Sequence, residues 1–490
     1  MITDLDELDV FPMEDQTPDI CICGAGVAGI TLALNLSPKL NIVLLEAGGF
    51  DYSSISQEVY KGSIVGHDYF DPMTTRLRFL GGTSNHWSGL CRPLDQDDFE
   101  SKEHVEYSGW PIEHSDLEPY LEDAKSILDI PRNVVQTEEP LVTELNKSND
   151  FSTIDVWYSA PTRFGPKYES LLRDAQNIKC YVNANVTDIS LSEGLSRVTD
   201  IRIQNYASKT FVITPKKFVL ASGGIENPRI MLSCDSQLPE GLGNSFGLVG
   251  RFFTEHPHTP IGGFILEDRF KTGEPDTTFV APTDTFLHKT GLLKFLIRIY
   301  RYDPTSRPSF RARVRRILCG TSQGLVRSVF SSECKVDGEL RMVSQQAPNF
   351  SSRIVLGPER DRFGTRQTAI DWRLQEIDVQ TIKQGAVRFG EVFASLGIGR
   401  MRVSEWLLPE YPELPWDGEA VAGNHHMCTT RMASSPQNGV VDSNHKVFGI
   451  ANFYVAGSSV FSTGGHANPT FTIVQMSLRL ADHLSTISKL

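Results

Sequence analysis

The fold of the first part of this chain is decided by the stretch Asp19-Ile20-Cys21-Ile22-Cys23-Gly24-Ala25-Gly26-Val27-Ala28-Gly29. An apolar run leads into the glycines, and a helical pattern follows them. Gly24, Gly26 and Gly29 allow a tight turn and a close approach of the backbone to a pyrophosphate, which then rests on the helix N-terminus. A second apolar run over 41–45 ends at Glu46, where a carboxylate can accept a hydrogen bond from an adenosine ribose. The pattern predicts a dinucleotide-binding strand–turn–helix unit; it does not separate FAD from NAD, and a turn with incidental glycines is the alternative.

Length and composition set the class of protein. The chain has 490 residues, more than one ordinary core accommodates, so two domains are expected. Apolar residues make up 40% and charged residues 22%, the balance of a soluble globular protein. The formal net charge of −13 argues against nucleic acid as a partner, because phosphate binding needs clustered lysine and arginine.

The N-terminus and the cysteines bear on location. Residues 1–17 hold six acidic and no basic residues, and we expect a solvated, partly disordered acidic extension, with an interaction tail as the alternative. We expect neither a secretory signal nor a twin-arginine signal in this segment. A membrane span is not expected either, because the sequence contains no run of about eighteen apolar residues. The eight cysteines lack paired spacing, and Cys21 and Cys23 are interpreted as core thiols, so a cytoplasmic location is expected.

The change in residue composition along the chain predicts how the domains are arranged. Glycine-rich, motif-dense sequence occupies 18–112, 179–258 and 421–490, whereas 113–178 and 259–420 alternate more and carry many charged turns. This interleaving predicts an α/β, Rossmann-like nucleotide domain assembled from three segments, with a second domain inserted between them.

Two further motifs fit a cofactor site in the nucleotide domain. An apolar strand over 217–220 ends in small residues up to Gly224, and we expect a helix to begin at Glu226, with Pro228 in its first turn. The loop Leu80-Gly81-Gly82-Thr83-Ser84-Asn85-His86-Trp87-Ser88-Gly89 is rich in small and hydroxyl residues, so a cofactor ring can lie against its backbone. An ordinary strand-to-helix corner explains the first motif equally well in isolation.

Near the C-terminus, His425 and Asn468 lie on either side of a strand-like run, Phe453-Tyr454-Val455-Ala456. A neutral imidazole is a natural acceptor for a hydroxyl proton, whose removal lets a hydride leave the same carbon, and an amide can hold the substrate oxygen. Asn468 followed by Pro469 predicts an N-cap and the first position of a helix, whose positive end stabilises a negatively charged cofactor ring.

Each of these residues has a structural alternative, because any of the twelve histidines can simply be a buried hydrogen-bonding group. A zinc site at His425 and His426 is not expected, since no cysteine or carboxylate lies at ligand spacing, and no metal is predicted. Nothing marks Cys428 as a low-pKa thiol, so a packing role is expected for it.

Taken in order, these motifs resemble the glucose–methanol–choline (GMC) family of FAD-dependent oxidoreductases. The resemblance covers most of the chain through the segments 24–46, 81–82, 93–94, 109–112, 223–224, 249–252, Glu255-His256-Pro257, Gln345-Gln346, 348–349 and 352–354, and the segments around His425 and Asn468. Two positions depart from the family pattern. Cys428 stands where glycine is usual, and His466 stands where relatives often have a small residue, which leaves open which imidazole is the main base.

The resemblance implies FAD as cofactor, a substrate domain built on an antiparallel sheet, His425 as catalytic base and Asn468 as its partner. The cofactor-binding positions that it implies are Gly24, Gly26, Ala28, Gly29, Glu46, Ala47, Gly81, Gly82, Thr83, Asn85, His86, Trp87, Ser88, Val186, Ala221, Gly223, Glu226, Gly457, Asn468, Pro469 and Thr470. Val186 is expected near the adenine, and Gln345, His426 and His466 in the substrate pocket. Some members bond FAD covalently at the position of His86; we expect FAD here without that bond.

Within the family, Asn85-His86-Trp87 looks most like pyranose oxidases and bacterial sugar dehydrogenases. The resemblance therefore implies oxidation of a secondary hydroxyl of a sugar, glycoside or similar polyol to a ketone. Aliphatic, aromatic or sterol alcohols are the alternative substrates, and a lyase or decarboxylase that uses FAD without net oxidation is the alternative reaction. The electron acceptor, whether oxygen, a quinone or a redox protein, and the oligomeric state are left open.

Overall fold

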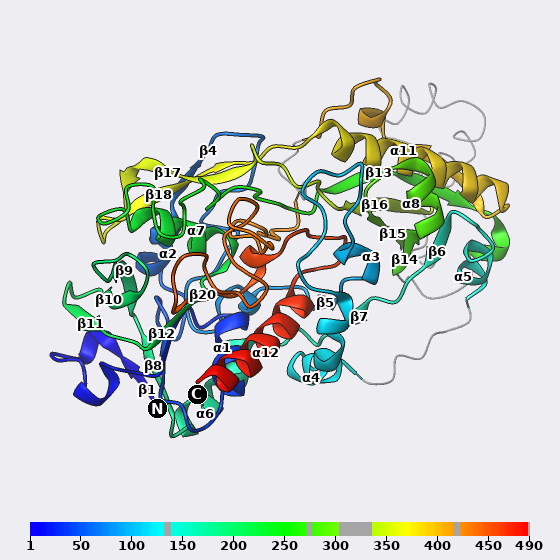
Figure 1. Cartoon of the computed structure of the whole chain (residues 1–490). Coiled ribbons are helices and arrows are strands. Elements are labelled where there is room, and N and C mark those ends of the chain that lie inside the picture. Colours follow the sequence, from blue (N-terminus) through cyan, green and yellow to red (C-terminus); the bar gives the residue numbers. More distant parts are fainter. Residues whose placement is uncertain (132–138, 272–276, 303–335, 416–421, 489–490) are drawn as a thin grey trace.

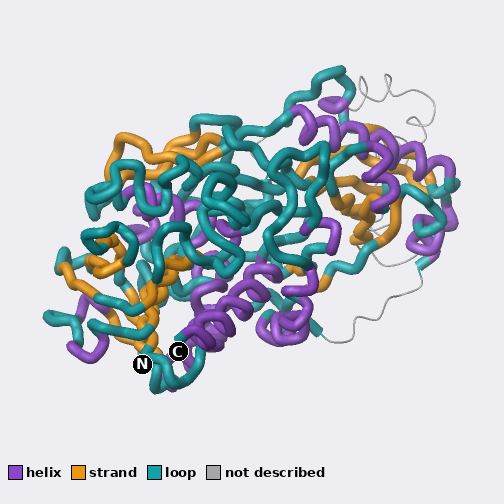
Figure 2. The backbone as a smooth tube through the Cα atoms, viewed as in Figure 1, coloured by secondary structure: helices purple, strands orange, loops and turns teal. Residues whose placement is uncertain are grey.

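The computed structural model describes residues 1–131, 139–271, 277–302, 336–415 and 422–488 (Figure 1). Two larger sheets lie at opposite ends of the molecule in this view, one beside the two termini and one beneath helix α11 (Glu376–Ser395). Figure 2 shows that much of the region between the two sheets is built from loops. The predicted α/β class is confirmed.

The first large sheet is parallel and has six strands. Their order across the sheet is β1 (Ile2–Asp4), β8 (Ile178–Val182), β3 (Ile42–Leu45), β2 (Ile20–Cys23), β12 (Lys217–Leu220) and β20 (Phe453–Val455). The central strands read as continuous apolar runs because both faces of the sheet are covered. Helices α1 (Val27–Asn35) and α12 (Thr470–Ile487) pack against each other beside the sheet.

The N-terminal residues belong to this sheet. Strand β1 pairs in parallel with β8 from Ile2 opposite Cys180 onward. Leu5 and Phe11 are buried in the core, and the Tyr181 hydroxyl donates a hydrogen bond to the carboxylate of Asp15. The prediction of a solvated, partly disordered extension over 1–17 is therefore wrong. Apolar side chains anchor the segment, and of its acidic residues Glu7, Asp9 and Glu14 are exposed whereas Asp15 is buried.

The second large sheet is antiparallel and carries a helix on one face. Its strands, in order, are β19 (Gly399–Val403), β13 (His258–Leu266), β16 (Gly338–Ser344), β15 (Phe295–Arg301), β14 (Thr277–Pro282) and β6 (Phe151–Thr153). Helix α11 packs on it through a phenylalanine-rich core that includes Phe295, Phe389 and Phe393. The helix approaches closely at Gly385, where a Cβ atom would lie 2.7 Å from the Phe295 ring.

Smaller elements make up the rest of the described part of the chain. The remaining strands are β4 (Gly62–Ile64), β5 (Leu90–Cys91), β7 (Trp157–Tyr158), β9 (Asn185–Leu191), β10 (Val198–Gln204), β11 (Thr210–Ile213), β17 (Arg353–Arg360) and β18 (Arg366–Asp371). The remaining helices are α2 (Ser54–Gln57), α3 (Gln96–Phe99), α4 (Leu121–Ile127), α5 (Pro140–Leu145), α6 (Phe164–Asp174), α7 (Gly223–Ser233) and α8 (Asp284–Thr290). Helices α4 and α6 pack against α12 and α1 respectively, so part of 113–178 adjoins the parallel sheet; the two-domain division itself stays a prediction.

Two helix starts differ from expectation. Helix α7 begins at Gly223, three residues before Glu226, so Pro228 lies inside the helix and not in its first turn. Helix α12 begins at Thr470 after Pro469, and the Asn468 side chain makes no cap; its Nδ2 donates to the Leu90 carbonyl, 3.2 Å away. Both predictions of helix N-termini were wrong: the Asn468 side chain bonds the Leu90 carbonyl instead of capping α12, and α7 begins three residues before Glu226. Among the helices that the structure describes, none combines the length and apolar character needed to cross a lipid bilayer.

Candidate active site

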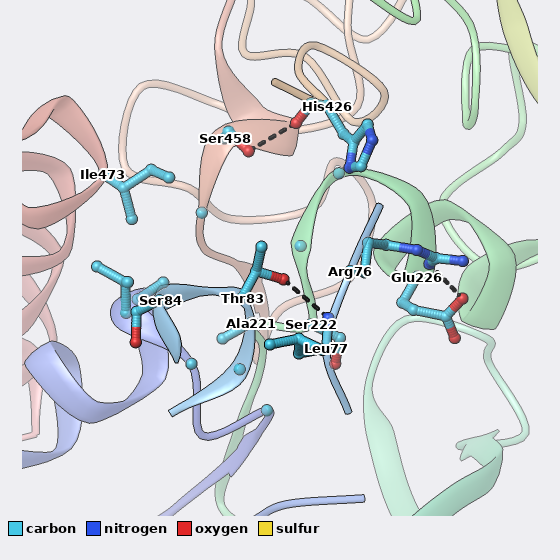
Figure 3. A pocket seen from close by; sticks show the side chains of 18 of the residues that line it. Arg76, Leu77, Thr83, Ser84, Ala221, Ser222, Glu226, His426, Ser458 and Ile473 are labelled. Carbon is cyan, nitrogen blue, oxygen red and sulfur yellow. Dashed lines mark hydrogen bonds and ion pairs between the residues drawn. The ribbon is translucent and has the colours of Figure 1, made fainter. Parts of the chain in front are cut away.

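A cavity of about 540 Å³ opens at the carboxyl ends of the parallel strands. Its wall includes Gly24 after β2, Glu46 after β3, Ala221 after β12 and Gly457 after β20. This edge is where α/β sheets of this kind bind ligands, because several strand ends and helix N-termini converge there. Figure 3 shows Ala221 after β12, Ser458 after β20 and Ile473 in the first turn of α12 around one space.

The glycines of this turn differ in what surrounds them: one faces free space that a ligand can occupy, and another is packed against the backbone. A Cβ atom on Gly26 would meet nothing within 4 Å, whereas a Cβ on Gly29 would lie 1.8 Å from the Gly24 carbonyl oxygen. Gly82 reaches the same corner, because a Cβ there would lie 3.3 Å from Gly26 Cα. Gly26 therefore faces open space in the cavity, while Gly29 lets α1 pack tightly on the turn. This cradle fits a dinucleotide.

Glu46 is held at the floor of this corner by backbone groups. Its Oε2 accepts from the Ala25 amide and its Oε1 from the Gly48 amide, each at 3.0 Å. Burial raises the pKa of the carboxyl, and these amide bonds act in the opposite direction. Each carboxylate oxygen retains acceptor capacity for a ligand hydroxyl, because it has lone pairs beyond the one used.

Most of the predicted cofactor positions line this cavity. They are Gly24, Gly26, Ala28, Glu46, Ala47, Gly82, Thr83, His86, Trp87, Ser88, Val186, Ala221, Gly223, Glu226, Gly457, Asn468, Pro469 and Thr470. Gly29, Gly81 and Asn85 are not in its wall but support it: the Gly81 amide donates to the Ala25 carbonyl at 2.8 Å, and Asn85 Nδ2 donates to the Leu80 carbonyl at 2.9 Å.

An arginine pair in the wall was missed by sequence reasoning. Arg76 and Arg78 line the cavity together with Tyr60, and the Arg76 guanidinium lies 3.9 Å from the centre of the Tyr60 ring. Arg76 is buried, and within the described residues its Nε and one terminal nitrogen have no hydrogen-bond partner. The signal was the pattern Arg76-Leu77-Arg78 immediately before the glycine loop, which places both cations on one side of an extended segment.

Glu226 is paired with arginines on both of its oxygens. Its Oε1 lies 2.8 Å from Arg76 and its Oε2 lies 2.9 Å from Arg229, as Figure 3 shows for the first pair. Burial would raise the pKa of this carboxyl, but Arg229 and Arg76 outweigh it and lower the pKa to about 2. Glu226 is thus a fixed anion in the wall that orients Arg76 beside the cavity.

His425 enters the cavity from a segment that is docked on α7. The ring of Pro228 removes the amide that would bond the Gly224 carbonyl within the helix, and the Thr429 hydroxyl donates to that carbonyl at 2.6 Å instead. Gly224 permits this approach, since a Cβ there would lie 2.1 Å from the His426 carbonyl oxygen.

A second histidine, also missed by sequence reasoning as a site residue, contacts the predicted base. His256 Nδ1 lies 2.9 Å from His425 Nδ1, and His256 Nε2 lies 3.2 Å from the Gly464 carbonyl oxygen. Burial lowers the pKa of His425 well below 6.5 and that of His256 to about 4, so both rings are neutral near pH 7. The signal for His256 was its place in the motif Glu255-His256-Pro257.

Glu255 links the two histidine segments through hydrogen bonds to their backbone. Its Oε2 accepts the amides of His425 at 2.8 Å and His256 at 3.2 Å, and its other oxygen accepts the Tyr69 hydroxyl. His426 lines the cavity, but its Nε2 lies 3.0 Å from the same Tyr69 hydroxyl, so its ring is engaged in this network. Burial raises the pKa of Glu255 to about 7.

Asn468 borders the same cavity from the start of α12. It also borders a second, very small space that contains His466, a fully buried ring with no hydrogen-bond partner among the described residues. Gln345 lies outside both spaces, with its backbone amide donating to the Lys294 carbonyl at 2.9 Å. The structure thus brings His425 and Asn468 to one cavity but not Gln345 or His466.

Neither a metal site nor a reactive thiol is found in this region. Within the described ranges, no group of three or more histidine, cysteine or acidic side chains is placed to hold a metal ion. Cys428 is buried, and burial raises its pKa to about 12, which leaves the thiol protonated and unreactive.

Comparison with known sequences identifies relatives. Residues 348–477 match the family model described as GMC oxidoreductase. A 2-methyl-1,2-propanediol dehydrogenase of Mycolicibacterium austroafricanum is 26% identical over 284 residues, which cover 56% of this chain and 48%, about half, of that relative. The fructose dehydrogenase large subunit of Gluconobacter japonicus is 21% identical over 566 residues, covering 96% of this chain and 98% of that protein.

Solved structures share the fold. A pyridoxine 4-oxidase from Mesorbium loti gives a TM-score of 0.61 at 14% identity, covering 95% of this chain and 98% of that one. A formate oxidase from Aspergillus oryzae RIB40, studied for FAD modification, gives 0.59 at 17% identity, covering 97% and 99%. Residues 348–477 thus match the GMC oxidoreductase family, and the relatives and the order of the motifs point to the same family of FAD-dependent oxidoreductases.

Proposed function

We propose that the chain binds FAD in the large cavity and oxidises a hydroxyl of a small polyol or sugar to a carbonyl. The observation that carries this proposal is one continuous cavity with the open glycine corner and Glu46 in one part of its wall and His425 and Asn468 in another. In this assignment Gly24, Gly26 and the α1 N-terminus hold the pyrophosphate and Glu46 the ribose. The parallel sheet is then a Rossmann-like FAD domain, and the antiparallel sheet belongs to an inserted substrate domain.

The protein's own residues would handle the proton. His425, neutral at pH 7, takes the hydroxyl proton at a ring nitrogen, while Asn468 holds and orients the substrate oxygen. As the O–H bond breaks, the C–O bond gains double-bond character and the C–H electron pair leaves the carbon with its hydrogen. Bound FAD supplies the acceptor for that hydride. An external oxidant, namely oxygen, a quinone or a redox protein, then takes the two electrons.

The substrate class rests on the relatives and on the resemblance of Asn85-His86-Trp87 to sugar-oxidising members. One relative is named for a propanediol and another for fructose, both molecules with several hydroxyls. A secondary hydroxyl of a sugar, glycoside or polyol is the first candidate, and a simple alcohol the second. An anaerobic screen of these compounds, followed by loss of oxidised-flavin absorbance in the dark, tests the assignment; product formed with an unbleached flavin favours a lyase or decarboxylase instead.

The pH dependence of flavin reduction follows from the lowered pKa of His425. The base form is the neutral ring, so activity is present above the pKa and is lost as the pH falls through it. Because burial, with His256, His258 and Arg298 nearby, moves that pKa below 6.5, the rate should stay level from pH 8 to below pH 6.5. Anaerobic stopped-flow measurements across pH check this. A decline centred at or above pH 6.5 would contradict it.

FAD is expected to be bound without a covalent link at His86. This residue lines the cavity, and burial lowers the pKa of its ring. Acid precipitation of the purified protein should release the yellow flavin into the supernatant. Flavin that stays with the precipitate of the wild type, but is released from His86→Ala, would show the covalent bond.

A further inference from the structure

We propose that His256 is a positioning residue that fixes the tautomer of His425, so that Nε2 of His425 carries the lone pair that takes the substrate proton. The proposal rests on the proposed function and assigns a specific atom to its base. The two histidines come from segments that are distant in the sequence: residue 256 lies two positions before β13, and residue 425 lies on the segment docked on α7.

The direction of the hydrogen bonds follows from a group that can only accept. The Gly464 carbonyl oxygen, 3.2 Å from His256 Nε2, has no proton to give, so Nε2 of His256 must carry one. The fit is close, since a Cβ on Gly464 would also lie 3.2 Å from that nitrogen. The opposite tautomer would set two lone pairs against each other in a buried site and leave both acceptors without a proton, which is unfavourable.

A neutral His256 with its proton on Nε2 has an acceptor at Nδ1. The partner atom 2.9 Å away, His425 Nδ1, must then donate, and the second nitrogen of His425 is left with its lone pair. Among the described residues no group hydrogen-bonds to that Nε2, and His425 lines the large cavity. The lone pair is therefore free for a hydroxyl in the cavity.

Burial keeps His256 in the form that this arrangement requires. His256 is fully buried, and burial lowers its pKa to about 4; a protonated His256 would donate at both nitrogens and reverse the tautomer of His425. The other titratable or charged groups around the pair are His258, His426, His466 and Arg298, and all four disfavour a further positive charge. The Glu255 carboxyl accepts the backbone amides of both histidines and does not touch their rings.

Removing the acceptor tests the proposal. His256→Leu should lower the rate of flavin reduction by about 10–10²-fold, the size of effect known for groups that orient metal-ligating imidazoles. His256→Asn can place an amide oxygen where Nδ1 stood and should restore most of the rate. His258→Leu is the matched control: its ring lies 5.7 Å from that of His425 without a hydrogen bond to it, so this variant should stay within a few-fold of wild type.

A spectroscopic measurement reads the tautomer without activity. In the oxidised FAD-loaded protein labelled with ¹⁵N-histidine, the signals lost in His425→Ala should show a protonated Nδ1 and an unprotonated Nε2. In His256→Leu the same ring should shift towards a protonated Nε2. An unprotonated Nδ1 on His425 in the wild type would overturn the proposal, even if His256→Leu fails to fold.

The rates separate this inference from the proposed function. If His425→Ala abolishes reduction while His256→Leu behaves as wild type, the positioning role is wrong and the base assignment stands. If His425→Ala is itself unaffected, the proposed base is wrong. Adding His256→Leu to His425→Ala should cause no further loss, because His256 acts only through His425.

Discussion

Replacing His425 with alanine should lower the rate of flavin reduction by about 10²–10⁴-fold, the contribution expected of a positioned general base. FAD content should stay near that of the wild type, because the proposed FAD contacts at Gly26 and Glu46 lie elsewhere in the cavity wall. The measurement is anaerobic stopped-flow loss of oxidised-flavin absorbance with saturating substrate, together with the flavin-to-protein ratio.

The control for this prediction is His466→Ala. His466 is the other imidazole near Asn468, but it lies outside the large cavity and burial lowers its pKa to about 3. We expect this variant to keep at least about a tenth of the wild-type rate, since its loss removes no proton acceptor from the cavity. Wild-type reduction by His425→Ala combined with a large loss in His466→Ala would move the role of base to His466.

The second large effect is expected from two glycines that differ in what they face. Gly29→Ala sets a Cβ 1.8 Å from the Gly24 carbonyl oxygen, so the turn or α1 must shift, which should destabilise the flavin-free protein by about 1–3 kcal/mol or more. Gly26→Ala meets no protein atom within 4 Å and should leave that stability unchanged. The added methyl group instead fills space assigned to the cofactor, and FAD affinity should fall about tenfold or more, ~1.4 kcal/mol.

Thermal unfolding of the flavin-free protein and titration with FAD distinguish these effects. Gly194→Ala serves as the reference, because its Cβ would meet only the Ser196 hydroxyl, at 3.8 Å. Equal loss of stability in Gly26→Ala and Gly29→Ala, or full FAD affinity in Gly26→Ala, would remove the cofactor from this corner.

The sequence predicted those parts of the fold that depend on residues close together in the chain. The run from Asp19 to Gly29 and the acid at Glu46 predict two adjacent buried strands and the helix between them, and the structure has β2, α1 and β3 there. Local residue types fix such units, because a tight turn needs glycine and a buried parallel strand needs a continuous apolar run.

The errors lie where distant contacts override local preference. Residues 1–17 look solvated by charge, yet Leu5 and Phe11 anchor them on the sheet. Pro228 looks like a helix start, yet it lies inside α7 because Thr429 uses the carbonyl that the proline leaves unbonded. Neither partner is visible from the local sequence, so propensity alone gave the wrong boundary.

The sequence predicted many of the residues that form the candidate site, but not the contacts that hold them in position. His425 and Asn468 do border one cavity, although their catalytic roles stay predictions. The contact between His425 and His256 joins residues 169 positions apart. A motif records that His256 is present, but only the folded chain shows that its Nδ1 meets the ring of His425.

The central claim is that an alcohol carbon gives a hydride to a flavin held in this cavity, while His425 takes the proton of its hydroxyl. The most direct measurement is anaerobic addition of polyols and sugars, in the dark, to the purified protein with its flavin content determined beforehand. We predict a stoichiometric yellow flavoprotein whose oxidised absorbance disappears with at least one such substrate as an equal amount of carbonyl product forms. A protein that cannot bind FAD, or product formed while the flavin stays oxidised without oxygen, would contradict the claim.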